Sequence, residues 1–232
     1  MLRELAQGHT LIIDKPLGWT SFEVVNKIRY HLRKRLNVKK IKVGHAGTLD
    51  PLATGVLVIC FGKHTKTINE LMAGEKEYTG KILLGKQTPS YDLESEFIKS
   101  VDTNTVTPES VEQIIPGFVG KIEQIPPTFS AKQIDGKRAY ELARSGEAPQ
   151  MKAANVEIFE LDINADHLPV LSFKVRCSKG TYIRSLAHDI GQSLRVGGTL
   201  IELRREASGA QHILDAKTVK EVIDFIDSAP LD

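Results

Sequence analysis

The segment from Lys42 to Leu57 reads KVGHAGTLDPLATGVL and carries the densest group of special residues in the chain. Glycines recur at positions 44, 47 and 55 around Pro51, a pattern typical of an ordered loop rather than a helix or strand. Pro51 disfavours helical geometry at Asp50, and the apolar run VLVICF that follows indicates a buried strand. The pattern therefore predicts that His45 and Asp50 lie on a loop beside the core. On spacing alone, an Asx-type turn stabilised by Asp50 explains the segment as well as a functional site does.

The segments on either side of this loop predict a mixture of strands and helices. Upstream, LIIDKPLGWTS predicts a short strand, a Pro-Gly turn and a helix N-cap at Thr20 or Ser21, with Glu23 in the first turn of a basic helix that ends near Arg35. Downstream, strands are predicted at 76–85, 156–163, 171–177 and 199–205, and helices at 107–115, 181–194 and 217–226. There is no βαβ rhythm, which favours an α+β fold with a mixed, largely antiparallel central sheet flanked by helices. A length of 232 residues is compatible with a single domain over 1–232.

The charge distribution is more informative than the net charge of +2. Between Lys27 and Lys42 there are eight lysines and arginines and no acidic residue. Such a block can neutralise several phosphates, although a solvated helix face is the usual explanation of a charge run.

Several classes of protein are disfavoured by the sequence. No apolar run is long enough for a signal peptide or a membrane span, so we expect a cytoplasmic protein. Cys60 and Cys177 lie far apart in apolar or alternating runs, which predicts buried free thiols. The motifs HExxH, GxSxG, paired CxxC and GxGxxG after a strand are absent, and GKILLGKQ at 80–87 only approaches a P-loop because Gln87 replaces the magnesium-binding hydroxyl.

Within the opening segment, GHAGTLDPLATG resembles the catalytic loop of the tRNA pseudouridine-55 synthases of the TruB type, whose pattern G-H-x-G-x-L-D-P-x-A-x-G it matches throughout. Further blocks agree in order and spacing: DKPLGWTS at 14–21, EYTGKILLG at 77–85, IPPTFSAKQIDGKRAYELARSG at 125–146, CSKGTYIRSLAHDIG at 177–191 and LRR at 203–205. The resemblance covers essentially the whole chain. It implies the pseudouridine synthase fold, with a thumb insertion of hairpin and helix at about 125–150, and conversion of uridine 55 in the T arm of tRNA to pseudouridine.

Three catalytic residues are implied by the resemblance. Asp50 matches the family's catalytic aspartate, which attacks the uridine or assists departure of the base, and a carboxylate suits the positive charge that develops on the ribose. Arg184 matches the arginine that pairs with this aspartate and keeps it ionised. Tyr78 matches the tyrosine that stacks on the target base. The reaction adds no group and involves no redox step, so no cofactor or metal is expected.

The resemblance also implies how substrate is bound. The target uridine must be flipped out of its loop, and His45 matches the histidine that helps to displace the stacked bases. Tyr182 and Leu203 match positions that line the substrate site. The basic residues of the thumb hairpin and helix, Lys132, Lys137, Arg138 and Arg144, would meet phosphates.

Two departures from the family are visible. Many members carry a C-terminal RNA-binding domain after the helix that follows LRR, and none is expected here. The run QTPSYDLESEF at 87–97 departs from the family's usual pattern, so no RNA contact is carried over to Thr88 or Asp92.

The expected partner is therefore tRNA, bound at its T arm by a monomer that requires no protein partner and no membrane. Two alternatives stay open: a non-catalytic RNA-binding protein or tRNA folding chaperone, and a synthase for another RNA.

Overall fold

The structure is a computed structural model that describes residues 2–129, 133–134, 137–138 and 151–230. The chain divides into two compact units: residues 1–78 with 203–232, and residues 79–202. The chain passes from the first unit to the second within strand β4 (Lys76–Leu84) and returns within strand β12 (Gly198–Ser208).

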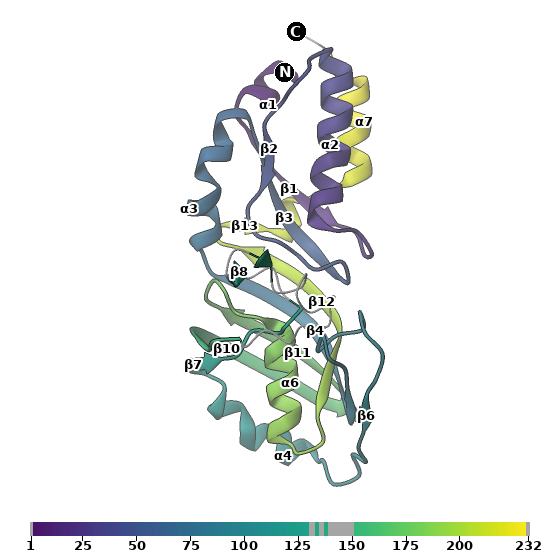
Figure 1. Cartoon of the computed structure of the whole chain (residues 1–232), viewed down its shortest axis with the longest axis vertical. Helices are drawn as coiled ribbons and strands as arrows, with labels where there is room; N and C mark the ends of the chain where they lie inside the picture. Colours follow the sequence, from purple (N-terminus) through teal and green to yellow (C-terminus); the bar gives the residue numbers. More distant parts are fainter. Residues whose placement is uncertain (1, 130–132, 135–136, 139–150, 231–232) are drawn as a thin grey trace. The chain divides into compact units, whose positions relative to one another are not determined.

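The first unit is a sheet with helices (Figure 1). Its strands follow the order β14-β1-β3-β12, with β2 paired to β3 and β13 paired to β12. The pairs β1–β3 and β2–β3 are antiparallel, whereas β1–β14 and β3–β12 are parallel. The strands are β1 (Thr10–Lys15), β2 (Val43–His45), β3 (Ala53–Phe61), β13 (Gln211–His212) and β14 (Lys217–Thr218), and the helices are α1 (Leu2–Gln7), α2 (Ser21–Leu36), η1 (Gly62–Thr67), α3 (Ile68–Ala73), η3 (Ile213–Asp215) and α7 (Val219–Ser228).

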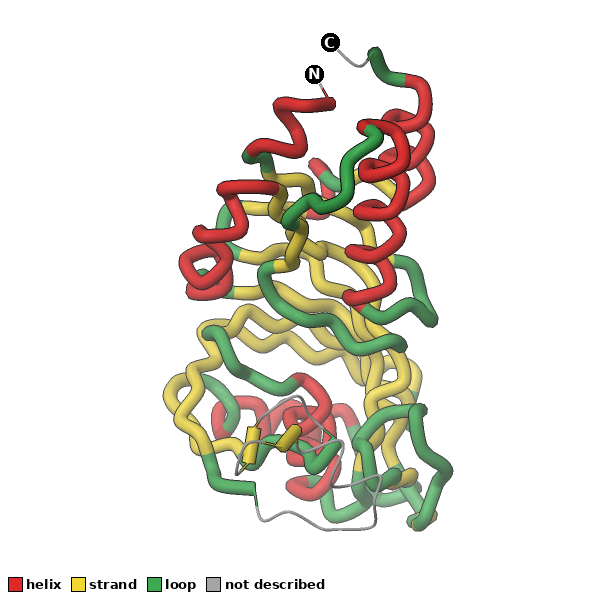
Figure 2. Tube along the Cα trace, turned by 45° about the horizontal axis from the view of Figure 1, so that its top comes forward, coloured by secondary structure: helices red, strands yellow, loops and turns green. Residues whose placement is uncertain are grey.

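Helices α2 and α7 lie side by side in the first unit, as Figures 1 and 2 both show. Helix α2 buries Val24, Ile28 and Leu32, and α7 buries Val222 and Ile226, so each helix presents an apolar stripe to the interior. Strand β3 is buried along nearly its whole length, as VLVICF predicted. Its side chains form part of the core next to the loop that precedes it.

The start of α2 is set by a local signal. The Thr20 side chain accepts a hydrogen bond from the Glu23 backbone, and the Glu23 carboxylate accepts from the Thr20 backbone N–H at 2.7 Å. This capping box satisfies backbone groups that the first turn leaves free, and it confirms the predicted start of the helix.

The second unit is a sheet with the strand order β12-β4-β11-β10-β7. The pairs β10–β11 and β10–β7 are antiparallel. The other elements are β5 (Lys86–Gln87), β6 (Lys99–Ser100), α4 (Pro108–Ile114), η2 (Ile115–Gly117), β7 (Gly120–Gln124), β8 (Gln133–Ile134), β9 (Lys137–Arg138), β10 (Ala154–His167), β11 (Val170–Cys177) and α6 (Ile183–Ser193).

Most sequence-based expectations agree with these elements. The mixed, mostly antiparallel α+β architecture is confirmed, and both cysteines are buried and free. Strands β2 and β3 take in Gly44 and Gly55, so the predicted glycine-rich loop is confined to residues 46–52. In the thumb, β8 and β9 pair antiparallel in the manner of the expected hairpin, whereas the helix expected through Arg144 lies outside the described residues.

Candidate active site

Asp50 lies on the loop of residues 46–52 that joins β2 to β3 in the first unit, hereafter the Asp50 loop. The Ala46 N–H donates to the carbonyl of Val58 at 2.8 Å, and the Ala53 N–H donates to the carbonyl of Asp50 at 3.0 Å. Both ends of the loop are thus tied to the buried β3 region, and the half-buried Asp50 is presented from an ordered backbone.

The turn after β1 is docked against this loop. The Lys15 ammonium is fully buried and donates to the carbonyls of Trp19 at 2.5 Å, Pro16 at 2.9 Å and Pro51 at 3.3 Å, and the Gly18 N–H also donates to the Pro51 carbonyl at 2.9 Å. The DKPLGWTS segment therefore supports the loop that carries Asp50.

Ser21 adds a second connection between these segments. Its hydroxyl donates to the Leu49 carbonyl at 3.0 Å and accepts from the Leu49 N–H at 2.8 Å. Because Leu49 immediately precedes Asp50, this paired contact fixes the backbone next to the carboxylate.

The electrostatics of the first unit are dominated by buried cations. Burial lowers the pKa of Lys15 to about 8 against the opposing charges of Asp50 and Glu23, and the charge of Arg205 makes the smallest contribution, in the lowering direction. Burial also lowers the pKa of His45, and Arg205 acts in the same direction. His45 is therefore neutral at pH 7, and its buried Nδ1 has no hydrogen-bond partner among the described residues.

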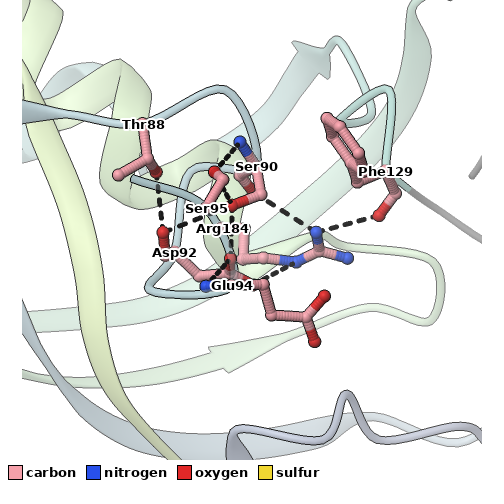
Figure 3. A network of polar contacts seen from close by, with 7 residues as sticks. All are labelled: Thr88, Ser90, Asp92, Glu94, Ser95, Phe129 and Arg184. Carbon is pink, nitrogen blue, oxygen red and sulfur yellow. Dashed lines mark hydrogen bonds and ion pairs between the residues drawn. The ribbon is translucent and has the colours of Figure 1, made fainter. Parts of the chain in front are cut away.

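Arg184 lies in the first turn of α6 in the second unit, within the network of polar contacts in Figure 3. Its side chain is 6% exposed. Its Nη1 donates to the carbonyls of Phe129 at 2.9 Å and Ser90 at 3.3 Å. Its Nε lies 3.6 Å from the Asp92 carboxylate, which is equally buried. The guanidinium is thus held by a carboxylate and two main-chain oxygens.

Asp92 is itself held in place. Its Oδ1 accepts from the Ser90 hydroxyl at 2.6 Å and from the Glu94 N–H at 3.0 Å, and Ser95 reaches the Ser90 hydroxyl at 2.6 Å (Figure 3). The Asp92 carbonyl accepts from the Thr88 hydroxyl at 2.7 Å. Because these hydrogen bonds fix the Asp92 carboxylate, it can hold the Arg184 guanidinium in one position.

The same loop contacts α6 one turn further on. Tyr91 has φ of +64° and stacks on His188, with ring centroids 4.0 Å apart and an angle of 19° between the planes. Burial raises the pKa of the neighbouring Asp189 to about 6. Since His188 follows Arg184 by four residues, both contacts lie on one face of α6.

Tyr182, at the N-cap of α6, is fixed through its backbone. Its N–H donates to the Gln124 side-chain oxygen at 2.8 Å, and the Gln124 amide donates to its carbonyl at 3.0 Å. Ser185 donates to the Ile125 carbonyl at 2.7 Å. The start of α6 is therefore attached to the end of β7.

The other residues expected from the sequence have varied surroundings. Tyr78 and Leu203 are each 9% exposed, so both sit at the border between core and surface. Lys132 lies outside the described residues, and for Lys137 and Arg138 only the backbone is described. Asp50 belongs to the first unit and Arg184 to the second, and their pairing stays a prediction.

Three residues with prominent contacts were not assigned from the sequence: Lys15, Asp92 and Arg205. Strand alternation could have pointed to Arg205, because it shares a face with the buried Leu203. Asp92 carried no such signal, since its segment departs from the family pattern and its partner is distant in sequence.

The basic residues between Lys27 and Lys42 fall into a half-buried group and an exposed group. Arg29 and Arg35 are half-buried and bond to Asn26 and to the Ala229 carbonyl, so they support the fold. The remaining six are exposed: Lys27, Arg33, Lys34, Lys39, Lys40 and Lys42.

A cavity of about 480 Å³ opens beside the end of this block. It is lined by Arg3, Lys40 and Lys42 with apolar and amide residues, and by no carboxylate. This lining suits an anionic group such as a phosphate.

Metal sites and membrane-spanning helices are both absent from the described part of the chain. No group of three or more histidines, cysteines and carboxylates there could hold a metal ion. Within the same residues, no helix is long and apolar enough to cross a membrane.

Known proteins resemble this chain over nearly its whole length. Residues 33–183 match the TruB family pseudouridylate synthase N-terminal domain. The tRNA pseudouridine synthase B of Phocaeicola vulgatus is 50% identical over 97% of this chain and 96% of that protein. The protein of the same name from Bacteroides thetaiotaomicron is 51% identical over 94% of each chain.

Solved structures agree with these relatives. The chain superimposes on one in a Cbf5-Nop10-Gar1 complex with a TM-score of 0.72 and 29% identity, covering 97% of this chain and 56% of that one. An H/ACA RNP bound to a substrate RNA containing 2'-deoxyuridine gives a TM-score of 0.69 at 27% identity, and this chain spans 54% of that one. The fold, the Asp50 loop and the extent of the sequence identity agree, and the chain belongs to the TruB family of pseudouridylate synthases.

Proposed function

We propose that this chain converts uridine 55 in the T arm of tRNA to pseudouridine, with Asp50 as the catalytic carboxylate. The observation that carries the proposal is the Asp50 loop, a full match to the family pattern whose backbone accepts hydrogen bonds from buried donors of two distant segments. Relatives about 50% identical, named tRNA pseudouridine synthase B, support tRNA as the substrate.

The reaction breaks the N1–C1′ glycosidic bond and forms a C5–C1′ bond, after which the C5 proton is lost and N1 is protonated. Asp50 either bonds to the sugar or stabilises the charge that develops on it. Arg184 would keep Asp50 ionised, and Tyr78 would stack on the base. No group is added or oxidised, so the atoms and electrons of the reaction balance without a cofactor or a metal.

Binding must expose the uridine before chemistry can begin. A neutral His45 at the base of the Asp50 loop suits contact with displaced bases, and Tyr182 and Leu203 would line the site. The exposed lysines and arginines of residues 27–42 and of the thumb would meet phosphates, including Lys132, Lys137 and Arg138. The protein would act as a cytoplasmic monomer without a protein partner.

The test is to incubate the protein with an unmodified tRNA transcript, with chelator and without cofactor, and to map pseudouridine at each nucleotide. We expect one modified uridine in the T loop, lost in Asp50→Asn and retained in the matched control Asp224→Asn, an exposed carboxylate on α7. Modification elsewhere in tRNA or only in another RNA would overturn the substrate. Tight tRNA binding with no modified uridine would favour the folding chaperone.

A further inference from the structure

Arg205 is a buried arginine in the first unit whose role the proposed reaction leaves unexplained. It lies on β12 with 2% of its surface exposed, and its backbone pairs with Gly55 of β3 in parallel register. The site therefore places a positively charged guanidinium group in the interior.

The side chain donates to main-chain carbonyls on both sides of Asp50. Nε donates to Val56 at 2.7 Å, Nη2 to Gly47 at 3.0 Å, and Nη1 to Thr48 at 3.5 Å. Two acceptors precede Asp50 by two and three residues, and the third lies in β3 beyond it. One planar group therefore joins the beginning of the Asp50 loop to the strand that follows it.

Glycine makes this arrangement sterically possible. At Gly55, φ is +98° and a Cβ would lie 2.2 Å from the Arg205 carbonyl oxygen, so any side chain there would collide with the backbone of β12. At Gly47, φ is +101°, a conformation that other residues rarely adopt. Two glycines of the GHAGTLDPLATG motif thus serve the approach of Arg205 to the loop.

The charge of Arg205 acts on both flanks of the Asp50 loop. In the described part of the chain its polar contacts are carbonyls and not carboxylates. Burial is the main cause of the lowered pKa of His45 at the start of the loop and of Lys15 beneath its end, and the charge of Arg205 acts in the same direction on both. A positive field that is not neutralised by a neighbouring acid favours a negative charge on the loop between them.

We infer that Arg205 is a positioning residue for the Asp50 carboxylate, which it serves by clamping the backbone of the Asp50 loop while touching no substrate itself. This inference rests on the proposed role of Asp50. Loss of the clamp should slow the chemical step more than it weakens tRNA binding, because misplacing a reacting group by about 1 Å can cost about 100-fold in rate.

The neighbouring Arg204 provides a matched control. Strand alternation directs it to the opposite face, where it forms an ion pair with Asp14 at 2.8 Å and is 35% exposed. Arg205→Lys keeps the charge but replaces the planar fork of three nitrogens, each of which donates to a different carbonyl, by a single nitrogen. Arg204→Lys makes the same chemical change outside the clamp.

The first measurement is the single-turnover rate at saturating tRNA, together with the dissociation constant for tRNA and the melting temperature. We expect Arg205→Lys to lose about 100-fold in rate with a dissociation constant within about threefold of wild type, and Arg204→Lys to retain both. A wild-type rate in folded Arg205→Lys, or equal losses in rate and binding, would overturn the inference.

The second measurement does not depend on catalysis. NMR titration of His45, assigned with His45→Gln, should show a higher pKa in Arg205→Met than in wild type, and an unchanged pKa in Arg204→Met. An unchanged His45 pKa in folded Arg205→Met would contradict the proposed electrostatic effect of Arg205 on the Asp50 loop. If Asp50→Asn stays active, the proposed function fails while this titration still tests the clamp.

Discussion

Asp50 and Arg184 are each fixed within their own unit, Asp50 on a loop held through its main chain and Arg184 facing a buried carboxylate. The Asp50 loop is held through its main chain, by donors from Lys15, Ser21 and Arg205 to backbone groups. Arg184 donates to the carbonyls of Phe129 and Ser90 and also faces the buried side chain of Asp92, which depends in turn on a neighbouring hydroxyl. Main-chain anchoring fixes a loop without restricting most of its side chains, whereas side-chain anchoring makes one residue dependent on the identity of another.

The largest expected effect comes from breaking the side-chain anchor. Asp92→Asn keeps the shape of the residue but removes the charge that faces Arg184, and we expect the single-turnover rate to fall about 100-fold. The tRNA dissociation constant should change little, since Asp92 is 4% exposed. Presteady-state pseudouridine formation measures the rate, with Asp102→Asn, an exposed carboxylate of the same unit, as control. An unchanged rate in Asp92→Asn would show that the anchor is dispensable.

A smaller effect concerns the stability of the main-chain anchor. The pKa of Lys15 is lowered from 10.5 to about 8 in the folded protein. Between these values the unfolded chain binds a proton that the folded chain has lost, so the free energy of unfolding should rise with pH. Below about pH 8 both states carry the proton, and the cost of burying the ammonium is fully present.

Urea denaturation of wild type and Lys15→Met between about pH 7 and 10.5 measures this difference. The free energy of unfolding of the wild type should rise with pH relative to that of the variant, by at most about 1.4 kcal/mol per pH unit. Parallel pH dependences in the two proteins would show that Lys15 has its ordinary pKa.

The smallest expected effect is that of removing one helix cap from each unit. Thr20 caps α2 in the first unit and Thr107 caps α4 in the second. Thr20→Ala and Thr107→Ala should each cost about 1 kcal/mol in the free energy of unfolding. Chemical denaturation measures both, and a cost well above that of a cap would indicate that the threonine has a further role. Thr107→Ala should leave the single-turnover rate unchanged.

Local sequence determined much of this protein. The capping boxes of α2 and α4 need only residues three positions apart, and β3 is recognisable as a run of apolar side chains. The Asp50 loop is a contiguous motif, so its position and its relation to the TruB family follow from the sequence. These features depend on neighbours along the chain, whose spacing is fixed by covalent geometry.

Only the tertiary structure decided what surrounds the functional groups. Arg205 meets Gly47 across 158 positions of sequence, and Arg184 meets Ser90 across 94. Neither contact has a local signal, because each exists only after strands or helices distant in sequence have packed together. Whether a buried arginine is a clamp or an ordinary ion pair depends on which groups that packing brings within hydrogen-bond distance, and here they are the carbonyls of the Asp50 loop.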